Sequence, residues 1–222
     1  MRGSASSRPL LRLPAVELVL VNSGRCWLHP SVAVIISLGL SFLFGAGDQY
    51  FGSFPQHPIM TQVSLLSAPW LAMAFLAGWT QLMPGSAMLL GVACTCAALI
   101  GYGAMTLSPL ENAHYSAQTI AGFVTSESAV IAGGALTGPL FGWLGYRWRT
   151  QRAWGGALGT ASTFCLEPLA RAVVLMHEPF ARVGGRAITA TAVLAGEGAV
   201  GLILATSIAI LFVQGARSEM QG

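Results

Sequence analysis

Long runs of apolar residues, separated by short polar connections, dominate the chain. A membrane-spanning helix needs about 20 mostly apolar residues, and six runs approach or exceed that length. They occupy residues 31–47, which is the shortest, and 62–82, 86–107, 118–146, 153–176 and 188–213. Helix-ending prolines stand in or beside the connections, including Pro58, Pro84 and Pro109. The pattern predicts an all-α fold, a polytopic integral membrane bundle of about six transmembrane helices.

The ends of the chain differ from this pattern. Residues 1–30 hold four arginines and only a short apolar run, 15–21, which Glu17 interrupts. That run is too short to span a bilayer, and no small-residue cleavage site follows it. We interpret residues 1–30 as a cytoplasmic segment with an interfacial helix rather than as a seventh span. Residues 31–213 then form the transmembrane domain, and residues 214–222 form a C-terminal tail.

The composition narrows the class of protein. The chain is 54% hydrophobic and 9% charged, whereas a soluble domain carries about 25% charged residues. So few charges cannot cover a water-facing surface, which argues against a soluble enzyme and a disordered regulator. All eleven basic residues are arginines, and no basic stripe alternates with aromatics, so no nucleic-acid partner is expected. The expected partner is the lipid bilayer, and the expected location is the inner (plasma) membrane, as a multi-pass protein.

The distribution of arginine predicts the orientation. With the N-terminus inside, eight arginines fall in inner segments and two, Arg182 and Arg186, fall in an outer loop. Positive residues accumulate on the cytoplasmic side of membrane proteins, so both termini are predicted to be cytoplasmic. Tyr146, Trp148 and Trp154 flank the basic loop at 147–152, as aromatic residues do at a membrane interface.

Three glutamates fall inside predicted spans. Each of Glu127, Glu167 and Glu197 lies about nine residues, or roughly 13 Å, from the predicted outer end of its helix. Glycines at four-residue spacing follow Glu127 (Gly134, Gly138, Gly142) and Glu197 (Gly201), which indicates that both helix faces pack against neighbours. Ionisable residues in a membrane are costly and usually functional. The three carboxyls are therefore predicted to line one layer of a polar-floored cavity, although each alone is also consistent with a structural role.

The charge count predicts different roles for these acids. Arg171 follows Glu167 by four residues, the favourable order for a helical ion pair, and Pro168 between them should bend the helix. Crowded carboxyls in a low dielectric cannot all ionise. Glu127 or Glu197 is therefore expected to be protonated near neutral pH and to act as a proton donor held in an apolar site.

Aromatic and loop residues supply the candidate substrate contacts. Aromatic faces stabilise cations, and Phe123 and Phe164 precede Glu127 and Glu167 on the same helix faces. Trp70 and Trp79 lie in the second run, and His114 and Tyr115 are expected at the rim of the cavity. No metal and no cofactor are expected: the spacing of Glu111 and His114 has no second copy, and the chain has no D-D-x-x-D run to hold magnesium and diphosphate.

Two stretches carry a family resemblance. Residues Ser67-Ala-Pro-Trp70 with Ala74-Phe-Leu-Ala-Gly78, and Gly138-Pro-Leu-Phe-Gly142 with Arg147-Trp-Arg149, resemble small actinobacterial six-helix membrane proteins. The resemblance covers residues 62–176. Among characterised proteins, the chain resembles the bacterial membrane-bound indole-sesquiterpene cyclases of the drimentine type in its size, its number of spans and its intramembrane acids.

The resemblance and the buried acids together favour a cyclase that starts its reaction by protonation. The expected partner is a lipophilic prenylated substrate such as a farnesylated indole, protonated by Glu127 as first choice or Glu197 as second. Glu167, oriented by Arg171, would stabilise positive charge or take the final proton. A proton-coupled small-molecule transporter, or a substrate-capture membrane subunit, is the alternative, because the same acids would serve it. A scaffold without chemistry and association into a homo-oligomer are left open.

Overall fold

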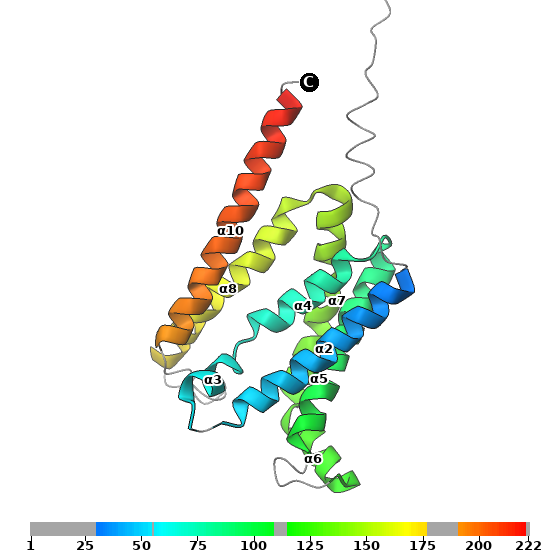
Figure 1. Ribbon diagram of the computed structural model, residues 1–222, viewed down its shortest axis with the longest axis vertical. Helices are drawn as coiled ribbons and strands as arrows, with labels where there is room; N and C mark the ends of the chain where they lie inside the picture. Colours follow the sequence, from blue (N-terminus) through cyan, green and yellow to red (C-terminus); the bar gives the residue numbers. More distant parts are fainter. Residues whose placement is uncertain (1–29, 55, 109–114, 177–190, 221–222) are drawn as a thin grey trace, which may run out of the picture.

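Helices make up all the regular structure of the described chain. The computed structural model describes residues 30–54, 56–108, 115–176 and 191–220, and no strand occurs in these ranges (Figure 1). The all-α prediction is therefore confirmed there, while the predicted interfacial helix of residues 1–30 falls almost entirely outside them. The helices are α2 (Pro30–Gly52), α3 (Pro58–Val63), α4 (Ala68–Trp79), α5 (Pro84–Thr106), α6 (Ala117–Ser126), α7 (Ser128–Gln151), α8 (Trp154–Met176) and α10 (Thr191–Met220).

Four of these helices are long and apolar enough to cross a membrane. They are the stretches Ser31–Gly52, Pro84–Thr106, Ser128–Gln151 and Ala192–Gln214, in α2, α5, α7 and α10. This indicates a membrane protein. The first span is longer than the predicted 31–47. The last candidate span ends at Gln214, where the predicted tail begins, and α10 continues as a helix to Met220.

Two predicted spans are interrupted. The run 62–82 is divided into α3 and α4, because Pro69 stands in the first turn of α4, where it has no N–H to donate and its ring would clash with the carbonyl of residue 65 in a continuous helix. The run 118–146 is divided at Glu127, between α6 and α7. Beside this break, the Thr125 and Ser126 hydroxyls donate to the carbonyls of Ala121 and Phe123 (2.8 and 2.9 Å). Such local bonds offer the backbone an alternative to a continuous helix.

Glycines set the close approach of the central helices. A Cβ on Gly142 of α7 would collide with the Ala87 carbonyl of α5, and one on Gly78 of α4 would collide with the Gly142 carbonyl. A Cβ on Gly138 would lie 2.9 Å from the Thr95 hydroxyl of α5. The predicted glycine stripe is therefore confirmed as a packing face at Gly138 and Gly142.

This packing predicts that two matched substitutions in α7 change the free energy of unfolding by different amounts. Gly142→Ala should destabilise the fold by about 1–3 kcal/mol or more, because the added methyl group meets backbone and not a movable side chain. Gly133→Ala should be neutral or slightly stabilising, because nothing lies within 4 Å of its added Cβ. Unfolding by SDS in mixed micelles measures both. Equal midpoints for the two variants would contradict the proposed contact.

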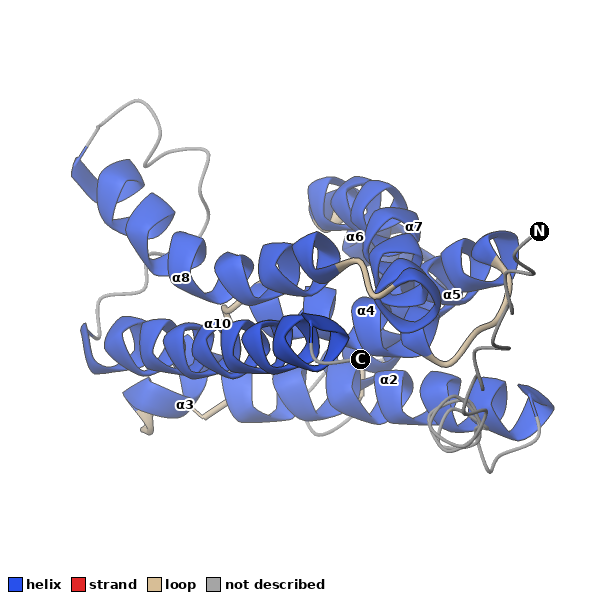
Figure 2. Cartoon of the chain, turned by 90° about the horizontal axis from the view of Figure 1, so that it is seen from above, coloured by secondary structure: helices blue, strands red, loops and turns tan. Residues whose placement is uncertain are grey.

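The last two helices form a separate pair. α8 and α10 run side by side in both views (Figures 1 and 2). A Cβ on Gly201 of α10 would lie 2.6 Å from the Cys165 sulfur of α8, so the small residue that follows Glu197 at four-residue spacing is also a packing position. Ile208 joins the core around Phe75, Phe141 and Ala157. The side chains of Ile210, Leu211, Phe212 and Val213 of α10 are exposed and so face the surroundings of the bundle.

Candidate functional site

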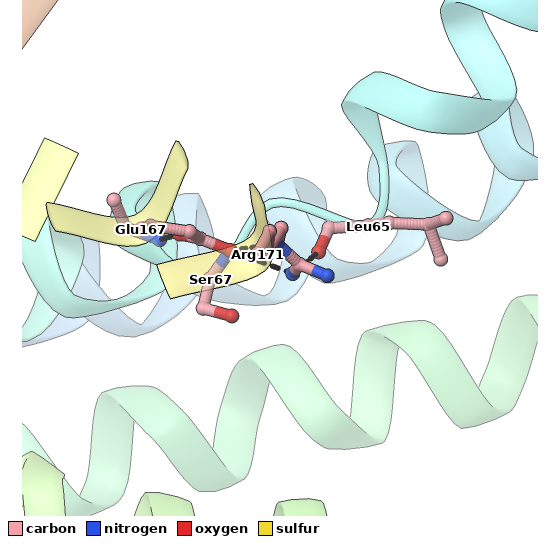
Figure 3. A network of polar contacts seen from close by, with 5 residues as sticks. Leu65, Ser67, Glu167 and Arg171 are labelled. Carbon is pink, nitrogen blue, oxygen red and sulfur yellow. Dashed lines mark hydrogen bonds and ion pairs between the residues drawn. The ribbon is translucent and has the colours of Figure 1, made fainter. Parts of the chain in front are cut away.

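The break between α3 and α4 is held by the predicted ion pair. Arg171 donates from Nη2 and Nε to Glu167 Oε1 at 2.6 and 2.9 Å, and its Nη2 also donates to the Leu65 carbonyl (Figure 3). The Glu167 carboxylate accepts from the backbone N–H of Ser67 at 2.9 Å and of Ala68 at 2.7 Å. These N–H groups begin α4 and have no partner within that helix, so an anion there is favoured.

This geometry assigns a structural task to Glu167 and Arg171. The pair joins α8 to the segment 64–67 and to the start of α4, because the carboxylate accepts from the N–H groups of Ser67 and Ala68 and the guanidinium donates to the Leu65 carbonyl. Neither side chain lines the two cavities described below. The carboxylate is fully occupied by donors, which leaves it badly placed to accept a proton from a substrate.

The larger cavity lies beside this break. It has a volume of about 440 Å³ and is enclosed by α2, α4, α5, the start of α7 and the segment 64–67. Most of its lining is apolar or aromatic, with Trp70 and Tyr102 among the aromatic residues, and two carboxyl residues line it, Asp48 and Glu127. Ligand sites are commonly apolar cavities of about 300–1,000 Å³ with a few polar groups, and this cavity has that character.

Asp48 is a candidate functional residue that lies one position beyond the first predicted span, 31–47. The apolar run of the first span ends at residue 47, but α2 continues to Gly52 and carries Asp48 to the cavity. The Trp70 indole lies close to the Asp48 carboxyl in the same cavity. The aromatic pair Tyr50-Phe51 after Asp48 was the feature of the sequence that could have indicated a helix extending beyond residue 47.

Glu127 reaches the same cavity from the break between α6 and α7. Its dihedral angles depart from the helix (φ −95°, ψ 12°), although its N–H still donates to the Phe123 carbonyl at 2.9 Å, and its side chain is half-buried. Phe123, one turn earlier, lies against Tyr102, with ring centroids 6.1 Å apart. Tyr102 in turn lies 6.4 Å from the Trp70 ring, at a steep angle. Aromatic rings therefore extend from beside Glu127 to Trp70, which lies close to Asp48.

Glu197 faces a second, smaller cavity. This cavity, about 350 Å³, is lined by apolar residues of α3, α4, α8 and α10, with Phe164 among them, and Glu197 is its one charged residue. The residue is 5% exposed, and neither carboxyl oxygen has a hydrogen-bond partner among the described residues. It lies close enough to Glu167 and Arg171 to interact with both electrostatically.

The single layer predicted for the three glutamates is therefore divided. Glu127 lines the larger cavity, Glu197 lines the smaller one, and Glu167 holds the chain segment that both cavities share, through Leu66. Equal depth along three helices did bring Glu167, Arg171 and Glu197 together. It did not place Glu127 in the same cavity, because α7 packs against α4 and α5, whereas Glu197 lies on α10, which packs against α8.

The other predicted substrate contacts have varied positions. Trp70 and Phe164 each line a cavity, whereas Phe123 lies beside one through Tyr102. Trp79 is 44% exposed at the end of α4, with the Arg149 guanidinium 5.9 Å from its ring. Tyr115 is exposed, lines neither cavity, and donates its hydroxyl to the Ala104 carbonyl at 2.6 Å. His114 lies outside the described residues.

Neither a metal site in the described residues nor similarity to known proteins indicates a function for the chain. Within the ranges that the structure describes, His, Cys, Asp and Glu form no group of three or more that could hold a metal ion. No protein-family model, no curated protein and no solved structure matches the chain. What the site can do therefore follows from its own chemistry. It provides two carboxyls and a series of aromatic rings in edge-on or tilted contact around an apolar space, inside a membrane protein.

Proposed function

We propose that the chain is a membrane-embedded terpene cyclase that protonates and cyclises a lipophilic prenylated substrate, such as a farnesylated indole, in the larger cavity. The observation that carries the proposal is the presence of Asp48 and Glu127 in one largely apolar cavity with Trp70 and Tyr102. A general acid, a cation-stabilising aromatic wall and a second carboxyl are the groups that such a reaction requires.

The proposed reaction begins at Glu127. Its protonated carboxyl gives a proton to the terminal alkene carbon of the substrate, and the alkene electrons form the new carbon–hydrogen bond. The cation is attacked by the next alkene, which closes a ring, and the faces of Trp70 and Tyr102 stabilise the moving charge. Asp48, beside Trp70, takes the final proton, so the product is an isomer of the substrate. The apolar walls keep water from quenching the cation.

A metal-free incubation in deuterated water tests this reaction. Detergent-purified protein should convert a farnesylated indole into a cyclic isomer that contains one deuterium, because the first proton comes from an exchangeable acid. Mass spectrometry reads both the unchanged skeleton formula and the added label. No conversion across a panel of prenylated aromatics, with folded protein, would overturn the proposal.

A proton-coupled transporter, or a substrate-capture subunit, is the second candidate, and one observation favours it. Two helical segments are interrupted beside carboxyls, at residues 64–67 and at Glu127. Interrupted helices of this kind form the substrate and ion sites of many transporters. The two candidates separate cleanly, since a cyclase works in detergent without a gradient, whereas transport requires sealed vesicles and a proton gradient.

The proposal includes the topology. We place six crossings in the inner (plasma) membrane: α2, α3 with α4, α5, α6 with α7, α8 and α10, with both termini cytoplasmic. The position of Arg147, Arg149 and Arg152 at the C-terminal end of α7 supports this orientation. The bilayer and the prenylated substrate are the proposed partners, and no cofactor takes part in the reaction. Cysteine labelling from either side of intact vesicles tests the orientation.

A further inference from the structure

The smaller cavity has a composition that points to a different ligand. Its walls are almost entirely apolar, with Ile59 and Val63 from α3, Phe164 from α8, and Val193 and Val200 from α10. Ile59, Val63 and Val200 are 59%, 47% and 46% exposed, so the cavity opens on the outer surface of the bundle. In a membrane that surface faces lipid, and a ligand would enter from the bilayer.

One buried polar group interrupts these walls. Glu197 is 5% exposed, and its two carboxyl oxygens accept no hydrogen bond from any described residue, although a protonated Glu197 lies close enough to share its proton with the Glu167 carboxylate. A buried carboxyl without partners costs free energy, so such groups are normally paired. Space for a partner exists beside it, because nothing lies within 4 Å of a Cβ placed on the neighbouring Gly196, which lines the same cavity.

The charges around Glu197 favour the binding of a cation over the binding of an anion. The charged groups that act on Glu197 are Glu167 and Arg171 of α8. Arg171 is already bound to the Glu167 carboxylate and the Leu65 carbonyl, and no charged side chain of α3 or α4 lines the cavity. The carboxyl of Glu197 is therefore the one group in this cluster without an opposite charge bonded to it.

We infer that the smaller cavity binds a lipophilic amine, with the nitrogen at Glu197 and the hydrocarbon along the apolar walls. A neutral amine takes the proton of the Glu197 carboxyl, if that group is protonated, to give an ammonium–carboxylate pair; no bond to carbon breaks. The face of Phe164 adds attraction for the cation. An alcohol of the same length lacks the charge, and a fatty acid would place a second carboxyl beside Glu197. The site is separate from the cavity of the proposed cyclase.

Binding of tritiated decylamine to the protein in phosphatidylcholine nanodiscs tests this inference. Scintillation proximity, corrected for uptake by empty nanodiscs, gives the affinity, and unlabelled decanol and decanoate should compete poorly. Hydrogen bonds to charged groups contribute about 1.5–3 kcal/mol, so Glu197→Gln should weaken decylamine binding by at least about tenfold. Asp48→Asn and Glu127→Gln, in the larger cavity, should leave it unchanged. The readout needs no turnover and is independent of the cyclase proposal.

A second pair of variants separates binding from folding. Gly196→Leu fills the cavity, whereas Gly198→Leu adds the same side chain two residues away, where nothing lies within 4 Å of the added Cβ and the residue does not line the cavity. Gly196→Leu should abolish decylamine binding and Gly198→Leu should retain it. Wild-type affinity in either Glu197→Gln or Gly196→Leu would overturn the inference. So would a loss confined to Asp48→Asn, which would place the amine in the larger cavity.

Discussion

Replacing Glu127 by glutamine should reduce turnover of a prenylated substrate by about 100- to 10,000-fold, the usual contribution of a positioned general acid. Glutamine keeps the size and the hydrogen-bonding capacity of the side chain, but it cannot give up a proton to an alkene. The backbone at Glu127 already departs from the helix, and the side chain is half-buried. Folding should therefore be preserved. Initial rates under saturating substrate, with deuterium incorporation into the product, measure the effect.

The matched control for this variant is the neighbouring Ser126→Ala. Ser126 lies at the same helix break, is exposed, and bonds only to the Phe123 carbonyl among the contacts described here. Its removal should change the rate less than about threefold. Asp48→Asn should also slow the reaction strongly, because the final proton would lose its acceptor. Wild-type turnover in Glu127→Gln would falsify the assignment of the acid. Equal losses of turnover in Ser126→Ala and Glu127→Gln would indicate a structural effect.

Replacing Arg171 by glutamine should destabilise the fold by about 3 kcal/mol, the lower end of the cost of breaking a buried pair. The Arg171 and Glu167 side chains are 22% and 12% exposed, so solvent offsets part of the loss. The change removes the bonds to Glu167 and to the Leu65 carbonyl, which together attach α8 to the segment between α3 and α4. SDS unfolding in mixed micelles gives the free energy.

Arg147→Gln provides the comparison. Arg147 lies on the outside of α7, bonded to Gln151 at 2.8 Å and 4.8 Å from the Trp143 ring centre, and its loss should cost less than about 1 kcal/mol. A double variant of Glu167 and Arg171 should cost less than the sum of the two single variants, because the two residues share one interaction. Independent, additive losses would show that the pair does not act as one connection.

The interruptions of the two predicted spans show where a hydrophobicity pattern reaches its limit. Residues 62–82 and 118–146 are apolar enough to suggest continuous helices, yet the chain breaks at 64–67 and at Glu127. The local signals were visible in Pro69 and in the hydroxyl cluster around residue 126. The way the interruption at 64–67 is stabilised was not visible, because an N–H group freed from a helix in an apolar environment needs a partner from another part of the chain. Here that partner is Glu167, about one hundred residues away in the chain.

The all-α class, the membrane character, the glycine faces and the pairing of Glu167 with Arg171 could all be predicted from the sequence. They follow from composition and from helical periodicity, which are local properties of the chain. Long-range packing was needed to show that Asp48 and Glu127 share a cavity, that Glu167 binds the segment between two helices, and that Glu197 faces a second cavity. Depth along a helix gives one coordinate of a side chain. Which cavity it enters depends on where each helix breaks and on the neighbour it packs against.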